Sequence, residues 1–194
     1  MSSIIFVHGA GATPRSFNYV RAQLGDTGHD HYDFAYDTNA PCRLAIDALK
    51  ALIASVSGPV YLVGHSLGGV VSVNAAYEAT AVRGVVTLSS PLGGVPAAQY
   101  LRWIFTSTLL DELSPYSSNI RNTLSRQPSC PVRSIVTFGN GLPFSKEESD
   151  GVVPTASQSA LAYAEKIRVN TNHFEVLLSD EVVGLIRDFV TSAN

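Results

Sequence analysis

Hydrophobic residues along this chain gather in six short runs, separated by polar or glycine-containing stretches. Runs of this kind predict β-strands, and longer stretches with apolar residues at helical spacing predict helices. The predicted strands lie near residues 3–8, 31–36, 59–65, 83–89, 132–138 and 165–170. The predicted helices lie near residues 14–24, 41–56, 67–79, 156–163 and 180–191. This alternation predicts an α/β fold with a mostly parallel sheet and helices on both faces.

A tight turn with the sequence Gly-His-Ser-Leu-Gly, residues 64–68, joins the predicted strand near 59–65 to the apolar helix that follows. A Gly-x-Ser-x-Gly turn between a strand and a helix is typical of a nucleophile elbow. Its glycines permit a sharp change of direction and a close approach of helix to strand. The hydroxyl of Ser66 would stand at the carboxyl edge of the sheet, above a helix N-terminus that favours developing negative charge. The turn therefore predicts a serine nucleophile.

His173 is the histidine best placed to act as a base toward Ser66. Where a nucleophile elbow carries a catalytic triad, its members follow along the chain as serine, acidic residue and histidine. The chain has five histidines, and only His173 follows Ser66. It lies in the polar loop after the predicted strand near residues 165–170. A lone loop histidine is usually a solvated side chain, but the elbow and the chain order favour the catalytic interpretation.

The acidic member must lie between the serine and the histidine, and Asp150 is the preferred candidate. Glu147, Glu148 and Asp150 share the loop after the predicted strand near residues 132–138, whereas the other carboxylates of this interval fall on predicted helices or open a strand. Asp150 is followed by Gly151 and an apolar segment that can anchor its carboxylate against the histidine N–H. An ordinary turn-forming aspartate is the alternative interpretation of Asp150. Glu148 or Glu147 would then supply the acid.

Backbone N–H groups close to Ser66 are expected to form an oxyanion hole. One donor in this kind of site is the N–H of the residue after the nucleophile, here Leu67. The other comes from an early loop between a strand and a helix. The small-residue loop at 8–11 follows the first predicted strand, and Ala10 is our candidate there. A glycine-rich connection without any catalytic role is the alternative.

Together these motifs resemble the α/β-hydrolase superfamily, and within it the small bacterial lipases and esterases. The matching segments are residues 7–9, 64–69, 150–154 and 172–177. The resemblance implies that Ser66 is the nucleophile, Asp150 the acid and His173 the base. It also implies that the N–H groups of Ala10 and Leu67 stabilise the oxyanion.

The resemblance further implies a single α/β-hydrolase domain over residues 1–194, with a reduced six-stranded sheet in the order 2-1-3-4-5-6. The sheet is expected to be reduced because many relatives carry extra strands before the strand near residues 3–8. Relatives also insert a cap or lid after the fourth strand, which corresponds to residues 93–131 here. The candidate substrate-binding residues in this insertion are Trp103, Phe105, Leu109 and Leu110. They would form a wall for an acyl chain, or an amphipathic helix there would simply complete the core, and the two interpretations are compatible.

Composition and charge narrow the classes of partner. The 194 residues carry a net charge of −3, which gives no sign of the positively charged surface that nucleic-acid binding requires. No apolar run is long enough to span a bilayer, and no secretory leader precedes the first strand. We therefore expect a cytoplasmic location, with secretion after removal of a leader as the alternative. Cys42 and Cys130 are expected to be reduced.

Residues 29–33, with the sequence His-Asp-His-Tyr-Asp, contain residue types that bind metals. They follow a turn-rich stretch, and the chemistry of a nucleophile elbow requires no metal. We therefore expect a solvated loop and the start of a strand rather than a metal site.

The motifs predict a serine carboxylic-ester hydrolase, a lipase or esterase that acts through an acyl-enzyme and needs no cofactor. Its partners would be a small-molecule or lipid ester and, transiently, a lipid interface; the oligomeric state stays open. The same groups could serve a thioesterase, an amidase, or a phospholipase or other lipid deacylase. A non-catalytic binding protein on the same fold is the alternative from a different class, and a complete Ser-Asp-His set argues against it.

Overall fold

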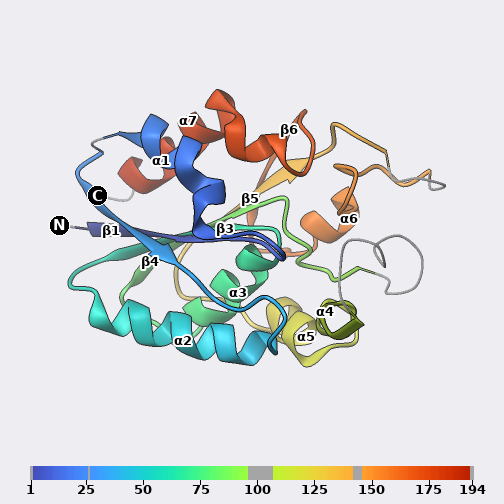
Figure 1. The fold of residues 1–194 in the computed structure, drawn as a ribbon, viewed down its shortest axis with the longest axis horizontal. Helices are drawn as coiled ribbons and strands as arrows, with labels where there is room; N and C mark the ends of the chain where they lie inside the picture. Colours follow the sequence, from blue (N-terminus) through green and yellow to red (C-terminus); the bar gives the residue numbers. More distant parts are fainter. Residues whose placement is uncertain (1, 26, 96–106, 142–145, 193–194) are drawn as a thin grey trace.

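The centre of the molecule is a six-stranded parallel sheet (Figure 1), in a computed structural model that describes residues 2–25, 27–95, 107–141 and 146–192. Its strands are β1 (Ser2–Val7), β2 (His29–Phe34), β3 (Val60–His65), β4 (Val82–Leu88), β5 (Val132–Thr137) and β6 (Glu165–Val169). They are ordered β2-β1-β3-β4-β5-β6, and each neighbouring pair is parallel. The predicted fold class and strand order are therefore confirmed.

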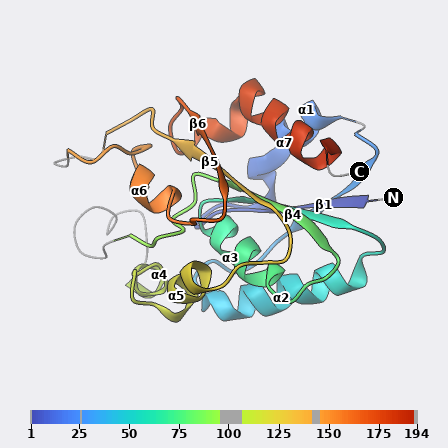
Figure 2. The same ribbon diagram turned by 180° about the vertical axis from the view of Figure 1, so that it is seen from behind.

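Helices cover both faces of this sheet, as the alternation of elements predicts. The face with α1 (Asn18–Leu24) and α7 (Asp180–Ser192) lies opposite the face with α2 (Cys42–Ser55) and α3 (Leu67–Ala76), as Figure 1 and the view from behind in Figure 2 show. A short 3-10 turn, Pro14–Phe17, leads into α1.

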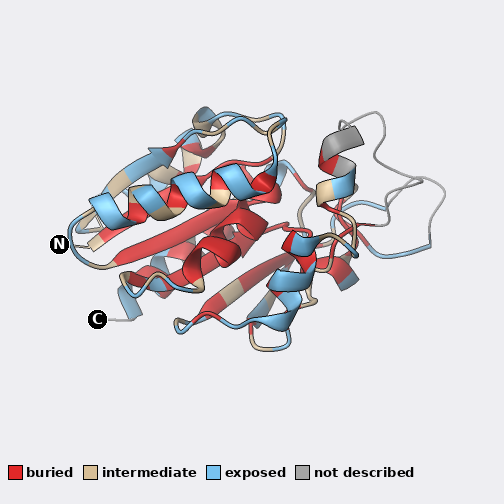
Figure 3. Ribbon diagram, turned by 90° about the horizontal axis from the view of Figure 1, so that it is seen from below, coloured by how far each residue is buried: buried red, intermediate tan, exposed pale blue. Residues whose placement is uncertain are grey.

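Successive side chains of β1 enter two separate hydrophobic cores, because they point to opposite faces of the sheet. Ile4 and Phe6 pack in the core that includes residues of α1 and α7. Ile5 and Val7 pack in the core that includes residues of α2 and α3. Burial on both faces explains why β1 and β3 are nearly continuous apolar runs. Figure 3 shows the same burial along α3, whose residues are buried on every side.

Two short elements escape the sequence prediction, α5 (Ser118–Ser125) and a 3-10 turn, Glu175–Leu178, whereas α4 (Ser107–Glu112) lies where an amphipathic helix was one of the two interpretations. In α5, the Ser117 side chain caps the helix by accepting the N–H of Ile120 at 3.2 Å. The helix has only eight residues, too few for a clear apolar period. The predicted helix near 156–163 is shorter in the structure: α6 (Thr155–Gln158) ends at the buried Gln158, whose side chain bonds to the backbone of β5.

The carboxyl ends of the parallel strands meet at one edge of the sheet, and the loops leaving this edge carry the candidate site residues. β1 leads into the loop with Ala10, and β3 leads directly to Ser66. β5 precedes the loop with Asp150, and β6 precedes the loop with His173. Residues that are far apart in the sequence are thereby brought to one place.

Among the residues that the structure describes, no helix has both the length and the apolar character needed to cross a bilayer. The two cysteines, buried Cys42 and half-buried Cys130, are free thiols. Burial raises the pKa of the Cys42 thiol to about 12, so this side chain behaves as a small core residue rather than a reactive thiolate.

Candidate active site

Ser66 stands at a sharp turn between β3, which ends at His65, and α3, which begins at Leu67. Its backbone has φ 54° and ψ −124°. This left-handed conformation is rare for a residue with a side chain and costs on the order of 1–3 kcal/mol. The N–H of Ser66 donates to the Leu88 carbonyl of β4 at 2.9 Å, which helps to hold the turn. The hydroxyl is thus presented at the N-terminus of α3.

Gly64 and Gly68 permit this turn because neither position has room for a side chain. A Cβ atom on Gly64 would collide with the backbone of Gly68, and one on Gly68 would collide with the carbonyl of Val7. The first glycine therefore lets α3 approach β3, and the second lets α3 approach β1. Both glycines have the packing role that the elbow motif predicts.

His173 lies between Ser66 and Asp150 and is hydrogen-bonded to both. Its Nε2 atom is 3.1 Å from the Ser66 hydroxyl oxygen, and its Nδ1 atom is 2.9 Å from Asp150 Oδ2. An ionised carboxylate only accepts hydrogen bonds, so Nδ1 carries the proton and Nε2 presents its lone pair to the serine. The backbone N–H of His173 also donates to the Asp150 carbonyl at 3.0 Å, which ties the two loops together.

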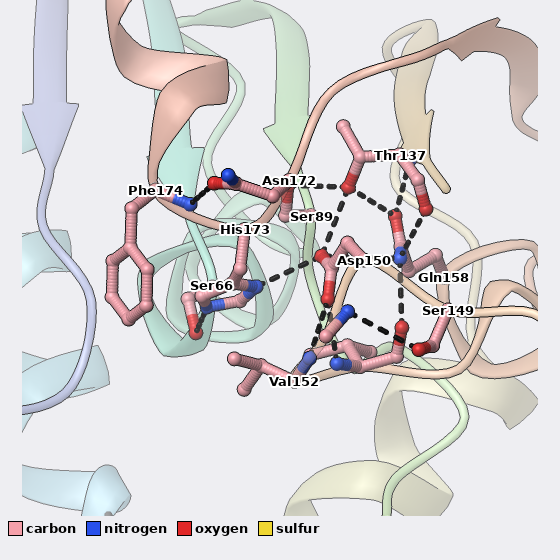
Figure 4. Close-up of polar contacts among 12 residues, drawn as sticks. Ser66, Ser89, Thr137, Ser149, Asp150, Val152, Gln158, Asn172, His173 and Phe174 are labelled. Carbon is pink, nitrogen blue, oxygen red and sulfur yellow. Dashed lines mark hydrogen bonds and ion pairs between the residues drawn. The ribbon is translucent and has the colours of Figure 1, made fainter. Parts of the chain in front are cut away.

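The Asp150 carboxylate is buried and surrounded by hydrogen-bond donors (Figure 4). Its Oδ1 atom accepts the backbone N–H groups of Val152 at 2.9 Å and Val153 at 2.7 Å. Burial alone would raise the pKa of this carboxyl, but His173 and the two N–H groups outweigh burial and lower the pKa below its usual value. Asp150 is therefore ionised at neutral pH.

Glu148 and Glu147, the alternative acids, are exposed, whereas Asp150 and His173 are buried. The Glu148 carboxylate pairs with Arg168 at 2.6 Å. Of these three carboxylates, Asp150 is the one bonded to the histidine ring, which agrees with the preference drawn from the sequence.

The His65 side chain is hydrogen-bonded to the backbone of the His173 loop, a contact that the sequence does not predict. Its Nε2 atom lies 2.8 Å from the His173 carbonyl oxygen, so Nε2–H is the donor. Burial, aided by the nearby His173, lowers the pKa of His65 to about 3, and the ring is neutral at physiological pH. Its position next to Ser66 in the elbow motif is the only sequence signal that could have found it.

A cavity of about 90 Å³ opens beside Ser66 and His173, and the β1 loop forms part of its wall. Ala10 lines it, and Gly9 packs so closely on the elbow that an added Cβ would lie 3.0 Å from Ser66 Cβ. Leu67 begins α3, so its N–H has no partner within the helix. The Ala10 loop and the start of α3 therefore flank the serine hydroxyl, where oxyanion donors are needed.

The apolar part of the cavity wall differs from the wall predicted between Trp103 and Leu110. Trp103 and Phe105 lie outside the described residues, as does the side chain of Leu110. Leu109 is buried in the hydrophobic core, which is the alternative interpretation of this segment. The apolar residues that line the cavity are Ala10, Ala12, Val152, Phe174 and Leu177.

Phe174 is the most exposed of these lining residues, with 64% of its surface accessible. Its ring meets the His173 ring edge-on, with the ring centroids 5.2 Å apart. The sequence signal for this residue was its position directly after the candidate base.

The histidine-rich segment 29–33 forms most of β2, at the edge of the sheet. His29 Nδ1 lies 2.6 Å from the hydroxyl of Ser2, and Asp33 pairs with Arg21. Within the described ranges, no three His, Cys, Asp or Glu side chains are grouped so as to hold a metal ion.

Comparison with known proteins agrees with this geometry. The family model described as alpha/beta hydrolase family matches residues 4–180. No curated protein sequence matches the chain.

Similar solved structures include the mature lipase BlEst2 of Bacillus licheniformis, with 18% identity, a TM-score of 0.76, and coverage of 99% of this chain and 91% of that chain. A monoacylglycerol lipase of Paleococcus ferrophilus is 15% identical, with a TM-score of 0.71 and coverage of 98% and 94%. A metagenomic carboxyl esterase is 16% identical, with a TM-score of 0.76 and coverage of 98% and 75%. At these identities the likeness establishes a shared fold.

Proposed function

Because the chain belongs to the alpha/beta hydrolase family, we propose that it is a serine ester hydrolase with Ser66 as nucleophile, His173 as base and Asp150 as acid. The observation that carries this proposal is the continuous hydrogen-bonded row of these three side chains. The two contacts, at 3.1 Å and 2.9 Å, join the serine hydroxyl to the histidine and the histidine to the carboxylate. The row begins at a strained elbow, where the positive φ of Ser66 costs stability and places its hydroxyl beside His173.

The first half of the reaction forms an acyl-enzyme. Ser66 Oγ attacks the ester carbonyl carbon while His173 Nε2 takes the hydroxyl proton. The resulting oxyanion accepts hydrogen bonds from the backbone N–H groups of Ala10 and Leu67. The ionised Asp150 carboxylate stabilises the imidazolium of His173. Collapse of the tetrahedral intermediate breaks the bond to the leaving alcohol, which receives the proton from His173.

The second half repeats these steps with water. His173 takes a proton from the water as its oxygen attacks the acyl carbon, and a second oxyanion forms in the same place. The bond to Ser66 Oγ then breaks, the proton returns to the serine, and the acid leaves. Every proton passes through His173 Nε2, so the chain's own residues complete the cycle.

The cavity beside Ser66 favours an apolar acyl group. Its described lining is mainly carbon, from Val152, Phe174 and Leu177 among others. Phe174 stands exposed at its rim and can cover a few methylenes of a longer chain. We therefore propose a carboxylic ester with a medium-length acyl chain as the substrate class.

A matched set of butyryl substrates, as oxyester, thioester and anilide, tests the proposed function. We expect kcat/KM to be highest for the oxyester, with little turnover of the anilide. Hydrolysis restricted to the thioester or the anilide would replace the ester assignment, and failure to hydrolyse all three would contradict a hydrolase.

Phe174→Ala is expected to weaken the preference for longer acyl chains. Each methylene that loses apolar cover costs up to about 0.8 kcal/mol, or roughly fourfold in kcat/KM. The ratio of kcat/KM for the hexanoate ester to that for the acetate ester should therefore fall about four- to tenfold. Leu124→Ala is the matched control, because Leu124 is also an exposed apolar residue but lies on α5. An unchanged ratio in a folded Phe174→Ala protein would show that this ring does not contact the acyl chain.

A further inference from the structure

Three buried polar side chains lie close to Asp150: Thr137 and Gln158 are on the side away from Ser66, and Ser89 is bonded to Thr137 (Figure 4). Ser89 follows β4, Thr137 ends β5 and Gln158 ends α6. Their exposed fractions are 0%, 0% and 1%. The reaction described above uses none of them. Burial of three polar groups is costly unless each is satisfied, so their partners show what they do.

The amide of Gln158 has a fixed orientation. Its Oε1 atom accepts the backbone N–H of Thr137 at 2.8 Å, so the other end of the amide must be Nε2. The two N–H bonds of Nε2 are shared among three acceptors: the carbonyls of Thr137 and Val153, both at 3.0 Å, and the more distant Asp150 Oδ2 at 3.3 Å. The backbone of β5 thus dictates that a donor, and not an acceptor, faces the carboxylate.

The hydroxyl of Thr137 points at the same carboxylate oxygen. Its Oγ1 atom lies 2.9 Å from Asp150 Oδ2 and 2.7 Å from the Ser89 hydroxyl. A hydroxyl has a single proton, and of the two acceptors that it faces, Asp150 Oδ2 at 2.9 Å is nearer than Gln158 Oε1 at 3.2 Å and carries the charge. Thr137 can therefore donate to Asp150 while Ser89 donates to Thr137. Both bonds form together in this arrangement.

The backbone of Ser89 is strained, which is a second observation on the geometry of this network. Its φ is 51°, so Ser89 and Ser66 are the two non-glycine residues with positive φ in the described part of the chain. Such strain persists where the surrounding structure demands a particular placement. Here the strained turn, anchored by the Ser89 N–H to the Ile135 carbonyl at 3.1 Å, places the Ser89 hydroxyl against Thr137.

We propose that Thr137 and Gln158, backed by Ser89, are positioning residues that hold the Asp150 carboxylate as an acceptor aimed at His173 Nδ1. The proposal rests on the proposed function. With the two backbone N–H groups on Oδ1, and with Thr137, Gln158 and His173 on Oδ2, every group bonded to the carboxylate is a donor. A rotated carboxylate would lose several of these hydrogen bonds. A proton on Oδ2 would face the donors of Thr137, Gln158 and His173, with no acceptor for it to bond to. His173 therefore keeps its Nδ1–H tautomer and its lone pair toward Ser66.

Thr137→Val and Thr137→Ser form the matched test. Valine keeps the shape and the strand preference of threonine but removes the donor, whereas serine keeps the donor. We expect Thr137→Val to lower kcat about ten- to a hundredfold with little change in KM, and Thr137→Ser to recover most of that loss. A carboxylate with one donor fewer is also more basic and favours the imidazolium, so the acid side of the kcat/KM profile should move to higher pH.

Gln158→Glu provides a second variant of nearly the same shape. It replaces the donor with a carboxylic acid that must share a proton with Asp150 or repel it. We expect a loss of kcat at least as large as that of Thr137→Val, and the same upward displacement of the acid side of the pH profile.

Thr123→Val controls for a purely structural role, because Thr123 is equally buried and bonds to Asn74 in a polar cluster between α3 and α5. It should lower the melting temperature and leave kcat and the pH profile unchanged. If Thr137→Val and Gln158→Glu behave like Thr123→Val while the wild type hydrolyses esters, the positioning role is overturned and the proposed function stands. If the wild type is inactive toward all three substrate classes, the proposed function fails first.

Discussion

Ser66→Ala should abolish ester hydrolysis, with a fall in kcat of about a millionfold. The hydroxyl that would form the acyl-enzyme is lost, and only the oxyanion donors and substrate binding remain to accelerate attack by water. The fold should survive, because alanine fits wherever the serine side chain fits. The measurement is the rate of release of the alcohol from a butyrate ester, beside a thermal melt of the same sample.

Ser72→Ala is the matched control for this change. Ser72 lies on the same helix and its hydroxyl donates to the Gly68 carbonyl at 2.7 Å, so it is a second buried serine that does not line the cavity. Its replacement should alter the rate by less than about threefold, because a hydroxyl bonded to its own helix contributes little. Activity of the Ser66→Ala protein comparable with that of Ser72→Ala would remove Ser66 from the chemistry.

Asp150→Asn should lower kcat by about ten-thousandfold. In the wild type, five hydrogen-bond donors surround the two carboxylate oxygens of Asp150. An asparagine side chain offers these donors only one oxygen. The amide NH₂ must then face a donor, and if it faces His173 it stabilises the tautomer with its proton on Nε2, which cannot accept from Ser66. The measurement is kcat at a pH where the wild type is fully active.

Glu148→Gln and Glu147→Gln are the controls for Asp150→Asn. Glu148 pairs with Arg168 on the surface, where exposed ion pairs contribute little, so the rate should change by less than about twofold. Near-wild-type activity of Asp150→Asn, together with a large loss in either glutamate variant, would assign the acid to that glutamate instead.

The elements that the sequence predicted well are those with a strong local pattern or a fixed chain order. Apolar runs predicted the buried strands, whereas the edge strand β2 is mostly polar, and the alternation of elements predicted the parallel sheet with both faces covered. Ser66 follows from its glycines and His173 from its place after the serine. Asp150 required elimination, because a turn aspartate before glycine has the same sequence whether or not it faces a histidine.

The contacts that the sequence did not predict are long-range ones that no local pattern encodes. Gln158 ends a four-residue helix, and its importance comes from β5, which reaches it from 21 positions away along the chain. Thr137 is an ordinary strand residue until the loop with Asp150 folds back on it. Leu109 has the apolar character of a substrate wall, and tertiary packing directs it into the core. In each case the function of the side chain depends on its partners in space.

Covalent labelling identifies the nucleophile itself. The protein would be treated with a fluorophosphonate, digested, and examined by mass spectrometry, with Ser66→Ala treated in parallel. Activation of Ser66 by His173 predicts one adduct per chain, on the Ser66 hydroxyl, and none on the Ser66→Ala protein. Failure of the folded wild type to react, or an adduct on another residue, would contradict a serine nucleophile at this elbow.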